Sequence, residues 1–136
     1  MDVLDTTAFS AAMRNEPAMV EFLRARQPGD IAVVPPVAAE IEYGIQRLEP
    51  GWRKRALLSE RQAKLLSAIR VLEWTPQASV EFGIIKASLE HAGTLIDDFD
   101  TAVAAIALAH NARVITANLS HFARVEGLSS LHWSAL

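Results

Sequence analysis

The chain has 136 residues, 51% of them hydrophobic and 21% charged, which is the composition of a globular domain and not of a disordered segment. It has no cysteine, which excludes disulfide scaffolds, thiolate zinc sites and a cysteine nucleophile and favours a reducing compartment. A formal net charge of −3 argues against binding nucleic acid by bulk charge. Residues 1–5 form no basic leader, and the longest apolar run, 102–109, is too short for a membrane span. We therefore expect one cytoplasmic domain over residues 1–136, with no membrane partner.

Short apolar runs alternate with helical patterns along the whole chain. In chain order, we expect a strand at 3–4, a helix at 17–26, a strand at 31–34, helices at 36–48 and 52–69, a strand at 70–74, helices at 78–91 and 102–109, a strand at 113–116, a short helix at 121–122 and an extended segment at 131–133. The run at 31–34 is continuously apolar, as in a buried parallel strand, and the helix at 102–109 is apolar on every side. This alternation predicts an α/β fold with a central, mostly parallel sheet of about four to five strands flanked by helices.

Four polar residues lie where these elements predict burial. Asp5 and Asn118 follow the ends of two strands, and Asp100 opens the apolar helix. Glu40 falls within the apolar stripe of its helix, whereas Glu42 is about 200° further round and should be solvated. Asp5, Asp100 and Asn118 also have structural interpretations, as a turn residue, an acid in a first helical turn and a loop asparagine. Glu40 is harder to dismiss, because a carboxylate on a core face is costly unless it is paired or binds a cation.

Together, the three acids and the amide predict an oxygen-rich pocket. Ligands of parallel sheets bind beyond the C-terminal ends of the strands, where these residues should gather. Oxygen ligands suit Mg²⁺ or Mn²⁺ and not zinc or copper. Such ions keep water ligands and bind phosphate oxygens, which is the chemistry of phosphodiester hydrolysis.

Four motifs follow one another along the chain: LDT at 4–6, AEIEYG at 39–44, IDDFDTAVAA at 96–105 and VITANLSHF at 114–122. In order and spacing they resemble the motifs of PIN-domain ribonucleases, and most closely those of the toxins of VapBC toxin–antitoxin modules. The ending FARVEGL at 122–128, with Trp133 after it, is also similar to that group. The resemblance covers essentially the whole chain.

The resemblance implies an endoribonuclease in which Asp5, Glu40, Asp100 and Asn118 are the catalytic residues. The three acids would hold one or two Mg²⁺ or Mn²⁺ ions, with Asn118 assisting, and hydrolysis would leave a 3′-hydroxyl and a 5′-phosphate. The family usually has asparagine two residues after the first aspartate, where this chain has Thr7. Its hydroxyl can still bond to a ligand carboxylate. Further residues expected beside the ligands are Thr6, Asp98 and Thr116, although Asp97 and Asp98 also suit helix caps.

The resemblance also implies a homodimer and a cognate VapB-type antitoxin whose tail covers the active-site groove. The helices at 36–48 and 52–69 offer apolar surface for that tail. Because the pocket is acidic, RNA contacts are expected from basic residues nearby. The candidates are Arg53, Lys54 and Arg55, followed by Arg61 and Lys64, and the alternative for all of them is a solvated helix face.

Two other functions stay open. A phosphohydrolase of the haloacid-dehalogenase type also has an aspartate after its first strand, but it needs a second aspartate where Thr7 stands. A catalytically silent PIN-like domain would only bind a partner, and the presence of all four site residues argues against it. Among the histidines, which show no metal-ligand spacing, His121 is a candidate for phosphate contact and the others are expected at surfaces or helix ends.

Overall fold

One sheet of five parallel strands forms the centre of the computed structural model, which describes residues 1–135. The strands are β1 (Asp2–Leu4), β2 (Ile31–Val33), β3 (Arg70–Val71), β4 (Arg113–Ile115) and β5 (Ser130–Leu131). Their order is β3-β2-β1-β4-β5, and Val3 pairs with Ala32 on one side and with Val114 on the other. The chain runs outward from β1 to β3 and then crosses to β4, so the strand order reverses between β1 and β4. Open parallel sheets bind their ligands at such a switch point.

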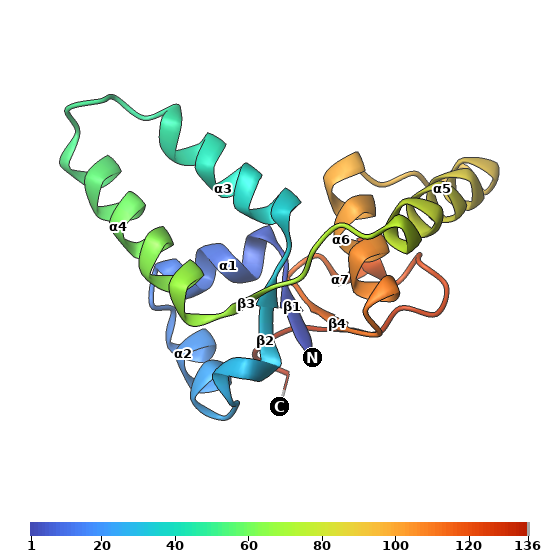
Figure 1. Cartoon of the computed structure of the whole chain (residues 1–136), viewed down its shortest axis with the longest axis horizontal. Helices are drawn as coiled ribbons and strands as arrows, with labels where there is room; N and C mark the ends of the chain where they lie inside the picture. The colour runs from blue at the N-terminus through green and yellow to red at the C-terminus, as the bar shows by residue number, and fades with distance from the viewer. Residues whose placement is uncertain (136) are drawn as a thin grey trace.

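Seven helices flank the sheet within the described residues. They are α1 (Thr6–Met13), α2 (Pro17–Arg24), α3 (Pro35–Gln46), α4 (Arg53–Ala68), α5 (Pro76–His91), α6 (Asp98–Ala109) and α7 (Leu119–Phe122), with a 3-10 turn η1 at Pro28–Asp30. Figure 1 shows α1 to α4 on one side of the central strands and α5 to α7 on the other. The predicted α/β class and parallel sheet are confirmed.

The core lies on both sides of the sheet, between its strands and the flanking helices, and α6 is the most deeply buried of these helices. Every residue of α6 from Asp100 to Ala107 is buried, which confirms the prediction of a helix apolar on all sides. Phe9 of α1 and Phe22 of α2 are fully buried on the other side of the sheet, and Phe122 of α7 is fully buried on the side of α6. Each buried aromatic or aliphatic side chain contributes about 1.5–3 kcal/mol to folding. No helix in residues 1–135 combines the length and apolarity needed to cross a membrane.

Two elements differ from the sequence-based expectations. Helix α1 was not predicted: it follows Asp5, whose side chain caps it by accepting a hydrogen bond from the Ala8 N–H at 2.9 Å. Its two threonines have weak helix propensity, so burial of Ala8 and Phe9 stabilises it. The strand expected at 70–74 is shorter, because β3 is an exposed edge strand that ends at Val71, and the chain then leads to Thr75, the N-cap of α5.

A buried ion-pair network fixes the N-terminal end of β1. Asp2 is 8% exposed and accepts hydrogen bonds from Arg26 at 2.9 Å and from Arg113 at 2.9 and 3.1 Å. Burial alone would raise the pKa of Asp2, but the bonds from Arg113 and Arg26 outweigh it and hold that pKa below its usual 3.8. The network joins β1, β4 and the segment after α2.

Candidate active site

Asp5 stands directly after β1 and is held by three donors. It is 1% exposed. Its Oδ1 accepts from the Thr7 hydroxyl at 2.6 Å and from the Ala8 N–H at 2.9 Å, and its Oδ2 accepts from the Thr116 hydroxyl at 2.5 Å. Burial nevertheless raises the pKa of Asp5 above its usual 3.8, although the bonds from Thr116, Thr7 and Ala8 lower it. All three donors are uncharged, so they orient the carboxylate without neutralising it.

Thr7 also ties Asp5 to the loop after β4. Its hydroxyl donates to Asp5 and accepts from the Ala117 N–H at 2.9 Å, so the hydrogen bond expected from Thr7 to the carboxylate is present. The Thr116 hydroxyl in turn accepts from the Asn118 N–H at 2.8 Å. Asn118 is therefore placed at the same sheet edge as Asp5, half-buried, as the N-cap residue of α7.

Glu40 reaches the site from α3 but lies less deeply than predicted. It is half-buried, and its Oε1 accepts from the Thr6 hydroxyl at 2.8 Å. The buried stripe of α3 is formed by Val37, Ile41 and Ile45. Residue 40 is about 60° round the helix from residue 37, so it lies at the edge of that stripe and not within it. Glu42 is exposed, as predicted.

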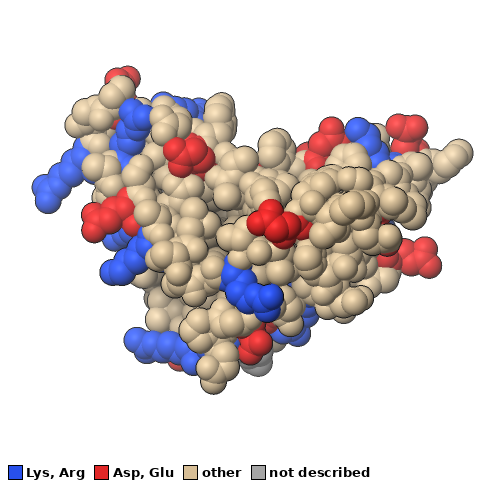
Figure 2. All heavy atoms as spheres, viewed as in Figure 1, with Lys and Arg blue, Asp and Glu red and all other residues tan. Residues whose placement is uncertain are grey.

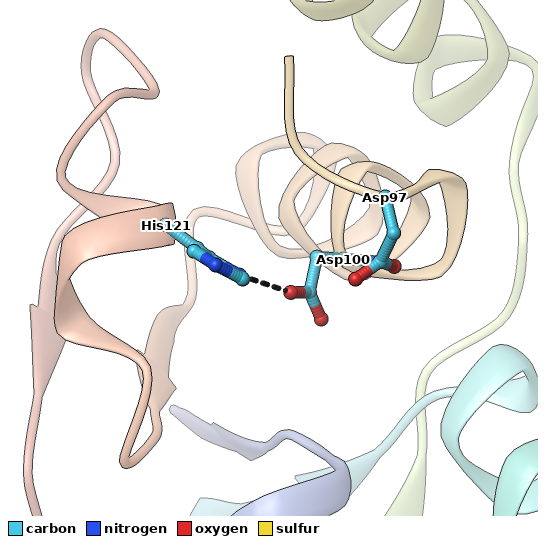
Figure 3. Close-up of side chains that lie close together, drawn as sticks. All are labelled: Asp97, Asp100 and His121. Carbon is cyan, nitrogen blue, oxygen red and sulfur yellow. Dashed lines mark hydrogen bonds and ion pairs between the residues drawn. The ribbon is translucent and has the colours of Figure 1, made fainter. Parts of the chain in front are cut away.

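The densest group of potential ligands lies where α6 begins and α7 passes it. Asp97 caps α6 by accepting from the Asp100 N–H at 2.8 Å, and His121 Nδ1 is 2.8 Å from Asp100 Oδ2. Asp97, Asp100 and His121 each offer one ligand atom, and these atoms lie within 4.8 Å of one another. Figure 3 shows the two aspartates at the start of α6 with His121 pointing at Asp100.

The electrostatic surroundings of Asp100 are unusual for a carboxylate. Its pKa rises from 3.8 to about 6, chiefly because burial removes water from the charged form. The hydrogen bond from His121 lowers this pKa, whereas the charges of Asp97 and Asp5 raise it. Asp5 and Asp100 therefore share one electrostatic field, as expected of two acids at one site.

Of the other residues expected beside the ligands, the structure places three threonines at the site and Asp98 away from it. Thr6, Thr7 and Thr116 all donate to site carboxylates, as the hydrogen bonds above show. Asp98, which was expected near the ligands, instead pairs with Lys86 at 3.0 Å, and its side chain is 66% exposed. The cap role falls to Asp97 alone.

Two members of the group were not assigned to it from the sequence. Asp97 was interpreted only as a cap, and His121 only as a phosphate contact. The available signals were the three-residue spacing from Asp97 to Asp100, which places both on one helical turn, and the position of His121 beside the buried Phe122. Neither signal shows that α6 and α7 meet.

The basic residues expected to contact RNA lie on α4. In Figure 2, blue side chains gather over α2 and α4 and are few over α5. Arg53 and Lys54 are exposed, with Lys54 5.4 Å from the Trp52 ring centroid, while Arg55 donates to Gln46 at 2.6 Å. Arg61 has a structural contact, since it donates to the Met13 carbonyl at 3.1 Å at the end of α1.

The buried acids differ in their basic partners, both at the two ends of β1 and at the start of α6. Asp2 has two arginines, but within residues 1–135 no Lys or Arg nitrogen lies within 4.0 Å of Asp5 or Asp100. Buried carboxylates that lack a basic partner are typically neutralised by a metal ion or a proton. The donor set, of carboxylate oxygens and one imidazole, fits a divalent cation.

Fold and site together define a parallel α/β domain with a cluster of carboxylates at the switch point of its sheet, where a cation could bind. The chain belongs to the PIN-domain family, whose model matches residues 3–128. This membership removes the dehalogenase-type alternative.

Known relatives match along almost the whole chain. The chain is 28% identical over 131 residues to the ribonuclease VapC2 of Haemophilus influenzae, covering 96% of each. It is 27% identical over 132 residues to the tRNA(fMet)-specific endonuclease VapC of Shigella flexneri, covering 97% of each. In fold it is similar to a chain of the Rickettsia felis VapBC2 complex bound to a promoter DNA fragment, with a TM-score of 0.87 and 23% identity over 97% of this chain and 98% of that one. A chain of FitAcB from Neisseria gonorrhoeae gives a TM-score of 0.88 at 23% identity, with both chains fully covered.

Proposed function

We propose that this protein is a cytoplasmic, divalent-metal-dependent endoribonuclease, the toxin of a toxin–antitoxin pair. The observation that carries the proposal is the pair of buried carboxylates, Asp5 and Asp100, which lie at the switch point of the sheet and have no Lys or Arg partner within residues 1–135. Relatives matched over 96% or more of this chain bear the names of ribonucleases and endonucleases. The names of similar complexes supply the toxin–antitoxin context.

Asp5, Glu40 and Asp100 would hold Mg²⁺ or Mn²⁺, with Asn118 assisting. Such an ion would supply an activated water and would neutralise charge that develops on the phosphate oxygens. The chain's own hydroxyls orient the ligands, with Thr7 and Thr116 on Asp5 and Thr6 on Glu40. These hydrogen bonds matter because the affinity of a site for its metal ion falls about 10–100-fold when partners of the ligands are removed.

RNA must approach an acidic site, so cationic groups outside it would bind the phosphates. Arg53 and Lys54 are exposed at the start of α4, and we assign them this role. Arg55, which already donates to Gln46, would contribute less. Affinity for RNA should then fall as the salt concentration rises.

A hollow between α1, α3 and α4 supports the antitoxin part of the proposal. It has a volume of about 250 Å³ and is lined by Met13, Ile41, Ile45 and Leu58 together with basic side chains. An antitoxin tail that combines apolar and acidic residues fits this lining. We propose that such a tail inhibits the enzyme and that the free chain forms a homodimer. Sedimentation and co-purification with the neighbouring small gene product test both points.

Cleavage of single-stranded RNA by the purified full chain tests the enzymatic proposal. We expect cleavage with Mg²⁺ or Mn²⁺, 5′-phosphate products, and no cleavage after chelation. Asp5→Asn should abolish activity, whereas Asp98→Asn, which alters an exposed acid on the same turn of α6 as Asp100, should retain it. Activity that survives exhaustive chelation would overturn the metal-dependent mechanism. A folded, metal-binding chain that cleaves no RNA would instead favour a silent PIN domain.

A further inference from the structure

His121 gives the carboxylate site a nitrogen donor that Mg²⁺ does not require. We propose that His121 binds the divalent ion directly through Nδ1, together with Asp100 and Asp97, so that the site takes Mn²⁺ in preference to Mg²⁺. The inference rests on the proposed function, because it concerns the ion that this function needs. It adds two ligands, His121 and Asp97, and a metal preference to the three acids and the asparagine assigned above.

The spacing of the three side chains fits ligands of one ion. Two atoms bound at right angles to an octahedral ion with bonds of about 2.1 Å lie about 3.0 Å apart, and two on opposite sides lie about 4.2 Å apart. His121 Nδ1 and Asp100 Oδ2 are 2.8 Å apart. The ligand atoms of Asp97, Asp100 and His121 all lie within 4.8 Å of one another, so small side-chain rotations suffice to bring them onto one ion.

The position of His121 is fixed by the fold. Its neighbour Phe122 is fully buried, and the His121 N–H donates to the Asn118 carbonyl at 3.1 Å. The imidazole is 37% exposed at one edge while Nδ1 faces Asp100, as Figure 3 shows. A metal ligand needs this combination of a fixed backbone position and a side chain that the ion can reach.

The charges around the three residues also favour a cation. Within residues 1–135, neither Asp97 nor Asp100 has a Lys or Arg nitrogen within 4.0 Å. Lys86, which contacts the same turn of α6, pairs with the exposed Asp98. The two carboxylates are therefore left without a fixed positive charge, although Asp100 is only 9% exposed.

The imidazole determines which ion is preferred. Mg²⁺ binds oxygen ligands almost exclusively, whereas Mn²⁺ and the later transition metals accept imidazole nitrogen. A site of carboxylates alone would discriminate weakly between Mg²⁺ and Mn²⁺. Replacing one oxygen donor by Nδ1 shifts the preference towards Mn²⁺. If His121 only donated a hydrogen bond to Asp100, no nitrogen would be bound to the ion.

Pulsed electron paramagnetic resonance of the full chain loaded with Mn²⁺ tests the inference. We expect nitrogen-14 coupling of a directly bound imidazole in the wild type and its loss in His121→Asn. His91→Gln, which changes an exposed histidine at the end of α5, is the matched control and should keep the coupling. Titrations with each ion should show that His121→Asn weakens Mn²⁺ binding by at least about tenfold and Mg²⁺ binding by less.

Two results would overturn the inference: Mn²⁺ bound without nitrogen coupling, or coupling that persists in His121→Asn. RNA cleavage assays on the same samples separate its failure from that of the proposed function. A Mn²⁺-dependent nuclease without nitrogen coupling rejects His121 as a ligand and leaves the nuclease proposal standing. A chain that neither binds Mn²⁺ nor cleaves RNA rejects both.

Discussion

Replacing Asp100 by asparagine should stabilise the metal-free protein at pH 7, although the residue is nearly buried. The pKa of Asp100 rises from 3.8 to about 6 in the folded chain, because burial and the charges of Asp97 and Asp5 outweigh the hydrogen bond from His121. At 1.36 kcal/mol per pH unit, this difference means that the ionised carboxylate destabilises the fold by about 3 kcal/mol. Asparagine keeps the shape and removes the charge.

The sign of the pH dependence follows from the raised pKa. The folded state binds the proton more tightly than the unfolded chain, so the stability from this group is present at acid pH and is lost as pH rises from 3.8 through 6. The advantage of Asp100→Asn should therefore be about 3 kcal/mol at pH 7, about half of that at pH 5, and close to zero below pH 4. For a domain of this size, 3 kcal/mol corresponds to about 10 °C in Tm.

The interaction of the Asp100 charge with the helix terminus opposes this stabilisation, but it is smaller. Asp100 is an acid in the first turn of α6, where a negative charge stabilises a helix by about 0.3–1 kcal/mol. Asp98→Asn removes an exposed charge from the same turn, together with its exposed ion pair to Lys86, and so sets an upper limit on this effect; we expect a small loss of stability. Thermal melts of both variants and the wild type with chelator, at pH 4, 5 and 7, make the comparison.

Bound metal should remove most of the stability advantage of Asp100→Asn over the wild type. The wild type should gain about 2.7 kcal/mol when the free ion is a hundredfold above its Kd, and Asp100→Asn should lose most of this gain and all cleavage. A variant that is less stable than the wild type at pH 7 without metal, yet responds normally to metal, would show that Asp100 serves only the first turn of α6.

Three further predictions follow from single contacts. Asp2→Asn should destabilise the protein by about 2 kcal/mol at pH 7, because two arginines lose their carboxylate partner. The loss should be smaller at lower pH, because the pKa of Asp2 is depressed and protonation removes its contribution in the wild type as well. Thermal melts at several pH values check this. Thr116→Val should cost about 1–3 kcal/mol, because a buried carboxylate loses a donor, and Thr116→Ser should restore it; unchanged melts would contradict the bond. Charge reversal of Arg53 and Lys54 should weaken RNA binding and lower the slope of log affinity against log salt concentration by about 0.7 per lost phosphate contact. The control Arg24→Glu on α2 should change neither quantity. If the variant with Arg53 and Lys54 reversed bound RNA as tightly as the wild type, these two residues would be part of a solvated helix face.

The strands and the buried helix could be predicted from the sequence because local pattern determines them. The β-branched runs at Ile31 and Val114 and the apolar residues of α6 specify burial on both faces or on all sides. Helix α1 could not be predicted, because its eight residues are stabilised by packing of Phe9 and by a cap from Asp5. The length of β3 depends on its place at the sheet edge, which the local sequence does not encode.

The same distinction applies to the site. Asp5 and Asn118 could be brought together from the sequence, because residues after parallel strands meet at one edge. The depth of Glu40 could not, since it depends on which part of α3 faces the core. The contact of His121 with Asp100 joins residues 21 positions apart on two helices, and it arises only when α7 packs against α6.

The two ends of strand β1 differ in a way that supports the proposed site. Asp2, at one end, is neutralised by two arginines and holds β1 to its neighbours. Asp5, at the other end and more deeply buried, receives hydroxyl and amide hydrogen bonds but no positive charge. An arginine beside Asp5 would lower its pKa, as Arg113 and Arg26 lower that of Asp2. The raised pKa values of Asp5 and Asp100 measure the resulting cost, and a bound cation would remove it. This contrast between Asp2 and Asp5 supports the proposal that the carboxylates at this edge hold a divalent cation.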